Sequence, residues 1–203
     1  MQSRSKSLAS SLLSRSTGVI HGRFQVLHND HLAYLLAGKA ECEHLVVGIT
    51  NPDPGLTSFD PADPERSDPR ANPLSFYQRM LMVKCALADA GLKGPDFSVT
   101  PLPINFPEQY GAYVPLQATF FLTIYDDWGR RKLEKFQSLG LKTKVLWERT
   151  PETKGLSSSQ IRQAMIDAEP WEHLVPQSTA TLCKAWDLPA VLRKAGGASY
   201  VSQ

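Results

Sequence analysis

The residues best suited to chemistry lie at a turn between a predicted strand and a predicted helix. This turn reads Gly22-Arg23-Phe24-Gln25-Val26-Leu27-His28-Asn29-Asp30-His31. Its two histidines are three residues apart, one just before and one just inside the helix, so both can reach one anion. A helix start adds free backbone N–H groups and a positive dipole, and Arg23 adds a forked cation. The turn therefore predicts a phosphate site; two incidental histidines or an i, i+3 metal pair are the alternatives.

A second candidate site stands about 130 residues later, at another predicted helix start. It reads Lys154-Gly155-Leu156-Ser157-Ser158-Ser159-Gln160-Ile161-Arg162. Serines before a helix are ordinary N-caps, but three in a row can also donate hydrogen bonds to phosphate oxygens. Arg162, one turn inside the helix, can neutralise developing negative charge. Alone this segment is a weak signal for phosphate binding, whereas the two segments together are a specific one.

The segments that would position these sites alternate between strand-like and helix-like patterns. Strands rich in Val, Ile, Phe and Thr are expected at 18–24, 45–50, 97–102, 118–124 and 143–148. Helices are expected at 30–40, 75–90, 128–139, 159–168 and 177–185. In the second helix, an apolar stripe is expected from Met80, Val83, Leu87 and Ala90, and the helix C-caps fit Gly91 and Gly140. The alternation predicts an α/β fold with a mostly parallel sheet.

Composition and charge argue against some classes of function. The 203 residues carry a formal net charge of +2, and residues 1–17 hold three basic residues and no acid, so the remainder carries −1. We expect 1–17 to be a flexible N-terminal extension, with an organellar transit peptide as the alternative, and 18–203 to be one domain. The near-neutral domain argues against a nucleic-acid partner. No apolar run is long enough to span a membrane, and three scattered cysteines suggest a reducing, cytoplasmic location.

One segment interrupts the alternation. Residues 51–72 contain five prolines and no plausible strand or helix. Long structureless loops inside a compact domain are usually functional or disordered. This one follows a strand's carboxyl end, where open α/β sheets place their ligand crevice, so we expect a lid on the substrate side.

Several motifs in order resemble the nucleotidylyltransferase superfamily with H-x-G-H and I-S-G-T-x-[IL]-R motifs, and within it the archaeal-type nicotinamide-mononucleotide (NMN) adenylyltransferases. Three family motifs find counterparts in Gly22 to His31, Asn72-Pro73-Leu74-Ser75-Phe76-Tyr77-Gln78-Arg79 and Trp171-Glu172-His173-Leu174-Val175-Pro176. The resemblance implies a Rossmann-like fold. It also implies attack of an acceptor oxygen on the α-phosphorus of a nucleoside triphosphate, without a covalent intermediate and with Mg²⁺ on the triphosphate.

The resemblance also implies roles for individual residues. The catalytic group would be His28, His31, Arg23 and Arg162. The nucleotide would be bound by Gly22, Phe24, Gln25, Tyr125, Asp127, Trp128, Ser157, Ser158 and Ser159. Candidates for the acceptor are Asn72, Arg79, Asn105, Tyr110 and, if the long loop closes, Arg70.

The chain departs from the family pattern in two places. Asp30 replaces the glycine of H-x-G-H; we expect it to cap the helix, with a position near Mg²⁺ as the alternative. On the acceptor side, Ile49 to Pro54 differs from the NMN enzymes, and Pro103 to Tyr110 lacks their nicotinamide-stacking tryptophan. These features resemble the branch that contains phosphonoformate cytidylyltransferases.

Two enzymatic hypotheses and one non-enzymatic hypothesis follow. The first is transfer of a nucleotide from CTP to a small phosphonate or phosphate. The second is synthesis of NAD from ATP and NMN. The third is a nucleotide-sensing module without turnover, which the carboxylate of Asp30 beside the phosphates would favour. The oligomeric state is open, with a homo-oligomer among the possibilities.

Overall fold

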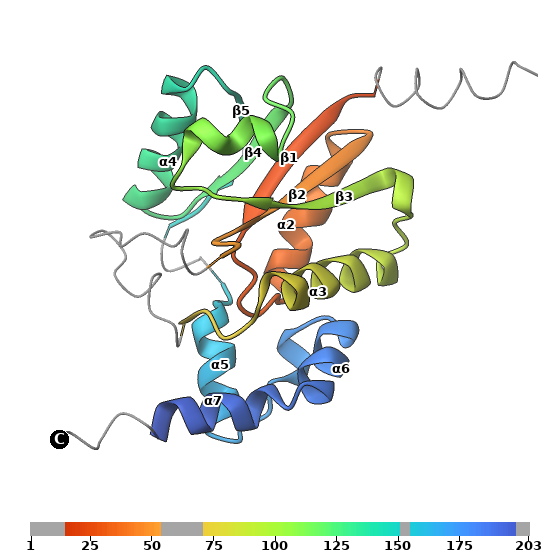
Figure 1. Cartoon of the computed structure of the whole chain (residues 1–203), viewed down its shortest axis with the longest axis vertical. Helices are drawn as coiled ribbons and strands as arrows, with labels where there is room; N and C mark the ends of the chain where they lie inside the picture. Colours follow the sequence, from red (N-terminus) through yellow and green to blue (C-terminus); the bar gives the residue numbers. More distant parts are fainter. Residues whose placement is uncertain (1–14, 54–70, 151–154, 198–203) are drawn as a thin grey trace, which may run out of the picture.

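The computed structural model describes residues 15–53, 71–150 and 155–197. Within them, five parallel strands form one sheet in the order β3-β2-β1-β4-β5 (Figure 1). The strands are β1 (Thr17–Gly22), β2 (His44–Thr50), β3 (Phe97–Leu102), β4 (Thr119–Ile124) and β5 (Lys142–Glu148). The helices are α2 (Asn29–Ala40), α3 (Phe76–Asp89), α4 (Asp127–Ser138), α5 (Ser158–Ile166), α6 (Gln177–Ala185) and α7 (Leu188–Gly197), with 3-10 turns η4 (Gly94–Asp96), η5 (Pro107–Ala112) and η7 (Glu172–Leu174). The predicted α/β fold with a Rossmann-like parallel sheet is confirmed.

Helices cover both faces of this sheet because its central strands are apolar on both sides. The residues of β1 alternate between two cores, with Val19 in one and Ile20 in the other. The Ile20 core is closed by α2 and α3, and the Val19 core by α4 and η5. Strands buried on both faces read as continuous apolar runs, which is why the sequence pattern predicts them well.

Helix α3 shows where the apolar pattern misleads. Its buried face consists of Arg79, Met82, Val83, Ala86 and Leu87. The predicted stripe is therefore partly wrong: Met80 is half-buried and Ala90 is exposed. Compared with the predicted stripe, the helix is rotated about its axis, and the first residue of its buried face is Arg79. The C-caps are Ala90 and Leu139, one residue before the predicted positions, and Gly91 and Gly140 follow them in the left-handed conformation with φ values of +91° and +72°.

Helix α7 was not predicted. Its ten residues end in two glycines, which disfavour a helix in isolation. In the fold, α7 packs against α5 and α6, and Figure 1 shows these three helices gathered at one end of the molecule, away from the sheet. Short helices depend on tertiary packing more than on propensity, so the contact decides the structure here.

The sheet opens between β1 and β4. These strands pair only at Gly18 with Thr119 and at Val19 with Phe120, whereas β1 pairs with β2 along its whole length. The chain also reverses its direction of travel across the sheet here, since β2 and β3 lie on one side of β1 and β4 and β5 on the other. Open α/β sheets bind ligands at the carboxyl ends of such strands.

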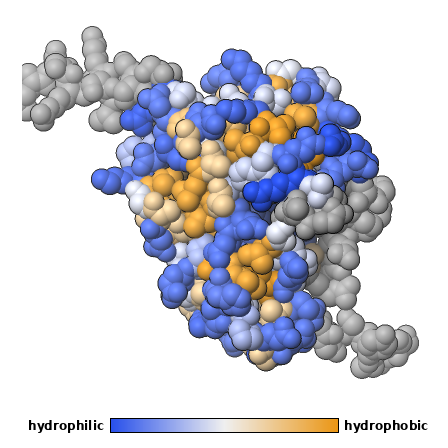
Figure 2. Space-filling view, turned by 180° about the vertical axis from the view of Figure 1, so that it is seen from behind, coloured by the Kyte–Doolittle hydropathy of each residue, from blue (hydrophilic) through white to orange (hydrophobic). Residues whose placement is uncertain are grey.

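The surface has no single dominant apolar face in the view from behind. Figure 2 shows hydrophobic residues there in separate patches divided by hydrophilic ones. The large hydrophobic residues most exposed within the described ranges come from four parts of the chain, namely Tyr77, Leu116, Leu139 and Val191. Among the described residues, no helix is both long enough and apolar enough to span a membrane.

Candidate active site

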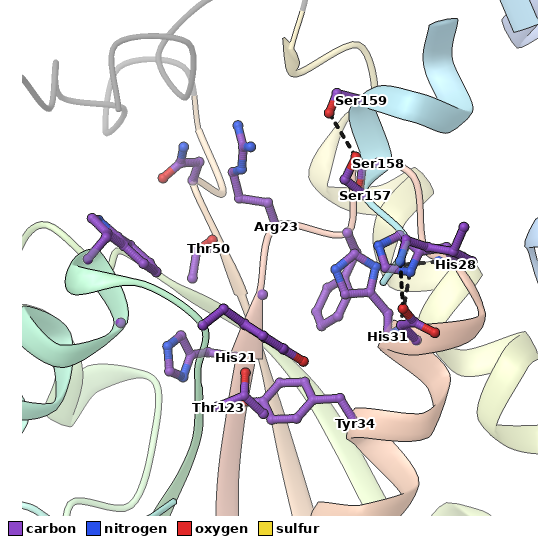
Figure 3. Close-up of a pocket in the computed structure, with 18 of the residues that line it drawn as sticks. His21, Arg23, His28, His31, Tyr34, Thr50, Thr123, Ser157, Ser158 and Ser159 are labelled. Atoms are coloured by element: carbon purple, nitrogen blue, oxygen red, sulfur yellow. Dashed lines mark hydrogen bonds between the residues drawn. The ribbon is translucent and has the colours of Figure 1, made fainter. Parts of the chain in front are cut away.

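A pocket of about 360 Å³ lies where β1 and β4 diverge. Its walls come from the carboxyl ends of β1 and β4 and from the starts of α2, α4 and α5. Figure 3 shows His28, His31 and Ser157 gathered on one side of it and His21 and Thr123 on the other. The fold thus brings together two segments that are about 130 residues apart in the sequence.

The two histidines are locked together by the start of α2. His28 is the N-cap, and its Nδ1 accepts the backbone N–H of His31 at 3.3 Å, while His31 Nδ1 accepts that of His28 at 3.4 Å. The two rings stack with their centroids 3.6 Å apart. Because each Nδ1 is an acceptor, the neutral form of each ring carries its proton on Nε2. The pair therefore has its ring positions and tautomers set before any ligand enters.

Burial keeps both rings neutral at pH 7. It lowers the pKa of His28 from 6.5 to about 4, although the charge of Asp30 opposes the shift. The pKa of His31 is also well below its usual value, first through burial and then through the neighbouring His28 and Arg23. Two neutral donors can meet phosphate oxygens and gain positive character as negative charge builds up.

This depressed pKa makes a prediction about stability. Unfolded His28 takes up a proton as the pH falls below about 6.5, whereas folded His28 resists protonation down to about pH 4. Its contribution to folding is therefore complete above pH 6.5 and is lost as the pH falls toward 4, by up to about 3 kcal/mol. When the pH is lowered from 6.5 to 4.5, we expect the free energy of unfolding, measured in urea, to fall by about 2 kcal/mol less in His28→Asn than in the wild type. Equal losses in both proteins would contradict this account, and His173→Ala, at an exposed histidine, should match the wild type.

The second segment lies beside the histidine pair, on the same side of the pocket (Figure 3). Ser157 is the N-cap of α5, and its hydroxyl lies 3.0 Å from that of Ser159. Ser158 donates to the Val26 carbonyl at 2.9 Å, and Arg162 donates to the Gln25 carbonyl. Two residues of this helix start are thus tied to the first turn. Nine of the predicted catalytic and nucleotide-binding residues in these two segments line the pocket, namely Gly22, Arg23, Phe24, His28, His31, Ser157, Ser158, Ser159 and Arg162.

The turn after β4 supplies the third wall, with one correction. Of the three predicted nucleotide ligands here, Tyr125 and Trp128 line the pocket and Asp127 does not. The neighbouring Asp126 lines it instead, and its Oδ1 accepts the N–H of Gly129 at 2.9 Å as the N-cap of α4. The prediction missed Lys132, which lines the pocket and holds its Nζ 4.4 Å from the Trp128 ring centroid. Its i+4 spacing from Trp128 on a predicted helix was the available signal.

Gln25 and Arg79 are structural in this fold, which corrects two interpretations. The Gln25 amide pairs with both the N–H and the carbonyl of Leu74, each at 2.9 Å, and does not line the pocket. Arg79 is only 2% exposed and is absent from the pocket walls. Its guanidinium donates to the carbonyls of Thr50 and Asn51 at 2.7 Å and of Arg23 at 3.0 Å. Burial, then the nearby Arg23, lowers the pKa of Arg79 to about 10, so it stays charged.

The remaining acceptor candidates divide in the same way. Asn105 lines the pocket, but Tyr110 is a core residue, 1% exposed, whose hydroxyl donates to the Ile104 carbonyl at 2.6 Å. Tyr110 therefore holds the backbone of Ile104, which lines the pocket next to Asn105, and does not line the pocket itself. Asn72 adjoins the pocket-lining Ala71 without lining the pocket itself. Arg70 lies outside the described residues, as does most of the predicted lid.

Asp30 does not cap α2, contrary to the expectation, because His28 does. Its Oδ2 instead accepts the backbone N–H of Leu156 at 2.7 Å, just before α5. In the part of the chain that the structure describes, no group of three or more His, Cys, Asp or Glu side chains could hold a metal ion. The two pocket carboxylates, Asp30 and Asp126, each already accept a backbone N–H. This donor set fits a cation held mainly by the phosphates of a nucleotide.

Comparison with known proteins places the chain. The cytidylyltransferase-like family model matches residues 19–164. Over 168 residues the chain is 51% identical to phosphonoformate cytidylyltransferase of Streptomyces viridochromogenes, covering 83% of this chain and 90% of that protein. It is 29% identical to nicotinamide-nucleotide adenylyltransferase of Thermococcus onnurineus, covering 82% and 81% of the two chains.

A solved structure supports the fold. The bifunctional NMN adenylyltransferase/ADP ribose pyrophosphatase of Francisella tularensis superposes with a TM-score of 0.63 at 15% identity, over 90% of this chain and 54% of that longer one. The expected family is confirmed by the family-model match. The match includes both phosphate segments and all five strands of the sheet, except for the first two residues of β1. The chain belongs to the cytidylyltransferase-like family of nucleotidyltransferases.

Proposed function

We propose that this chain transfers a cytidylyl group from CTP to a small phosphonate, phosphonoformate or a close analogue. A phosphonate oxygen attacks the α-phosphorus of CTP, the bond from that phosphorus to the bridging β-phosphate oxygen breaks, and pyrophosphate leaves. The observation that carries the proposal is the 51% identity to a phosphonoformate cytidylyltransferase over nearly its whole length. The pocket supports it, since both phosphate segments line its walls.

The residues act by positioning and by charge rather than by covalent chemistry. His28 and His31 present their Nε2 protons and stabilise the charge that develops at the α-phosphate. Ser157, Ser159 and Arg162, at the start of α5, hold the β- and γ-phosphates of the leaving group. Arg23, which lines the same pocket as His28, bridges donor and acceptor.

The base and the acceptor take the remaining walls. Tyr125 is held by a hydrogen bond from Trp147 Nε1 at 2.8 Å and, with Trp128, offers an aromatic surface for the cytosine and ribose. Asn105 faces the acceptor. Nucleotidyltransferases commonly use a divalent metal, and we propose Mg²⁺ bound to the triphosphate, where it would neutralise phosphate charge.

The second candidate is an NMN adenylyltransferase, favoured by the 29% identity to the Thermococcus protein. A four-way assay separates the two: purified protein with CTP or ATP and with phosphonoformate or NMN, with pyrophosphate release as the measurement. We expect release above the no-acceptor control with CTP and phosphonoformate, at least tenfold faster than with ATP and NMN. Release only with ATP and NMN would overturn the proposal, and release with neither pair would favour the sensing module.

Three further expectations stay predictions. The lack of a nucleic-acid partner rests on the near-neutral charge of residues 18–203. A cytoplasmic location rests on the cysteines, of which Cys42, Cys85 and Cys183 are all free thiols. The oligomeric state can be determined by light scattering of the purified chain.

A further inference from the structure

Asp30 joins the two phosphate segments. It sits in the first turn of α2, between the paired histidines, and its carboxylate accepts the N–H of Leu156 at 2.7 Å. Leu156 directly precedes Ser157, the N-cap of α5. Both Asp30 and Leu156 line the pocket. One side chain therefore bridges the start of the histidine helix and the approach to the serine helix, 126 residues apart.

The neighbouring residue is shaped to receive this carboxylate. Gly155 has φ +80°, a conformation that strains other residues. A Cβ on Gly155 would stand 2.3 Å from Asp30 Oδ2. Oδ2 is also the atom that accepts the Leu156 N–H, so relief of that contact would displace the acceptor. Aspartate at 30 and glycine at 155 thus form a matched pair.

A carboxylate beside a triphosphate needs a compensating benefit, because it repels the phosphates. A metal ligand would provide one, but the described residues contain no carboxylate cluster, and one oxygen of Asp30 is already committed. The organising contact provides another. The serine segment makes two other hydrogen bonds to the first turn, from Ser158 and Arg162, and both come from within α5. Among the described residues, the Asp30 contact is the one that fixes the chain entering that helix.

We propose that Asp30 is a positioning residue, which holds the Gly155–Ser157 segment against the start of α2 so that the serine N-cap is in place before the nucleotide enters. The inference rests on the proposed function for its catalytic consequence. When the contact is lost, part of the free energy of nucleotide binding is used to order the segment, so the nucleotide binds more weakly. The KM for the nucleoside triphosphate should then rise about tenfold, as expected for loss of a hydrogen bond to a charged group, while kcat changes less than threefold.

The test uses Asp30→Ala, Asp30→Asn and Asp30→Gly, with the exposed helical Asp89→Ala as the matched control. Asparagine keeps an oxygen for the Leu156 N–H and loses the charge. We expect Asp30→Ala and Asp30→Gly to show the tenfold KM increase, and Asp30→Asn to stay within threefold of the wild type. Hydrogen exchange of the Leu156 amide, measured without nucleotide, should accelerate at least tenfold in the Ala and Gly variants and be slowed again in Asn.

The exchange measurement needs no turnover, so it separates failure of this inference from failure of the proposed function. Unchanged exchange of the Leu156 amide in Asp30→Ala would overturn the inference even if the enzyme is active. An Asp30→Asn enzyme as impaired as Asp30→Ala, with a raised Mg²⁺ requirement, would identify a metal ligand instead. Faster turnover in Asp30→Gly would show that the carboxylate only repels the phosphates, and would overturn it too.

Discussion

Replacing His28 by asparagine is expected to lower kcat about 100- to 1000-fold while leaving the protein folded. His28 has two roles, as N-cap of α2 and as a neutral Nε2 donor on the pocket wall. Asparagine is among the best N-cap residues, so it keeps the first role and the cost in stability at pH 7 should stay within about 1 kcal/mol. It cannot supply the imidazole donor in the same place or acquire positive charge. Loss of one preorganised transition-state donor costs about this much in other enzymes.

The measurement is steady-state pyrophosphate release, with urea unfolding as the folding check. His173→Ala is the matched control, because His173 is an exposed histidine whose side chain is not on the pocket wall. It should retain activity within twofold. If His28→Asn kept more than a third of wild-type kcat, the stacked histidine pair would be a structural cap and not part of the chemistry.

Replacing Arg79 by methionine is expected to destabilise the fold by about 3 to 5 kcal/mol. The Arg79 guanidinium joins the end of β2, through the Thr50 and Asn51 carbonyls, to the chain after β1, through the Arg23 carbonyl. Methionine fills similar space but leaves these carbonyls without their donor, two of them on bonds of 2.7 Å. The same three residues line the pocket, so activity should fall together with stability.

Urea unfolding measures the effect, and two further variants sharpen it. Arg79→Lys keeps the charge but cannot span three carbonyls, so it should lose about 2 kcal/mol and remain measurable if the methionine variant fails to fold. Lys84→Met, on the exposed face of the same helix, should change stability by less than about 0.5 kcal/mol. Unchanged stability with a raised acceptor KM would restore the interpretation of Arg79 as an acceptor ligand.

The corrected residues show why sequence alone assigns some roles and not others. His28, Ser157 and the strand ends were predictable because helix starts and apolar runs are local features. Gln25, Arg79 and Asp127 were placed in the site by their position in matching motifs. Gln25 and Arg79 in fact satisfy backbone groups 28 to 56 residues away, and no local pattern reports such a partner. Asp127 differs by one residue, because the N-cap that faces the pocket is Asp126.

Local patterns and motifs were enough to identify the family, the order of the five strands and of helices α2 to α6 along the chain, and the two helix starts that we expect to bind phosphate. Each of these depends on residues within a few positions of one another, or on motifs whose order is preserved. The folded structure was needed to show where β1 and β4 separate, which polar side chains line the resulting pocket and which hold its walls in place. It also gave Asp30 its partner. Those outcomes depend on which distant backbone groups must be satisfied once the sheet and its two cores have formed, and that is a property of the packed chain.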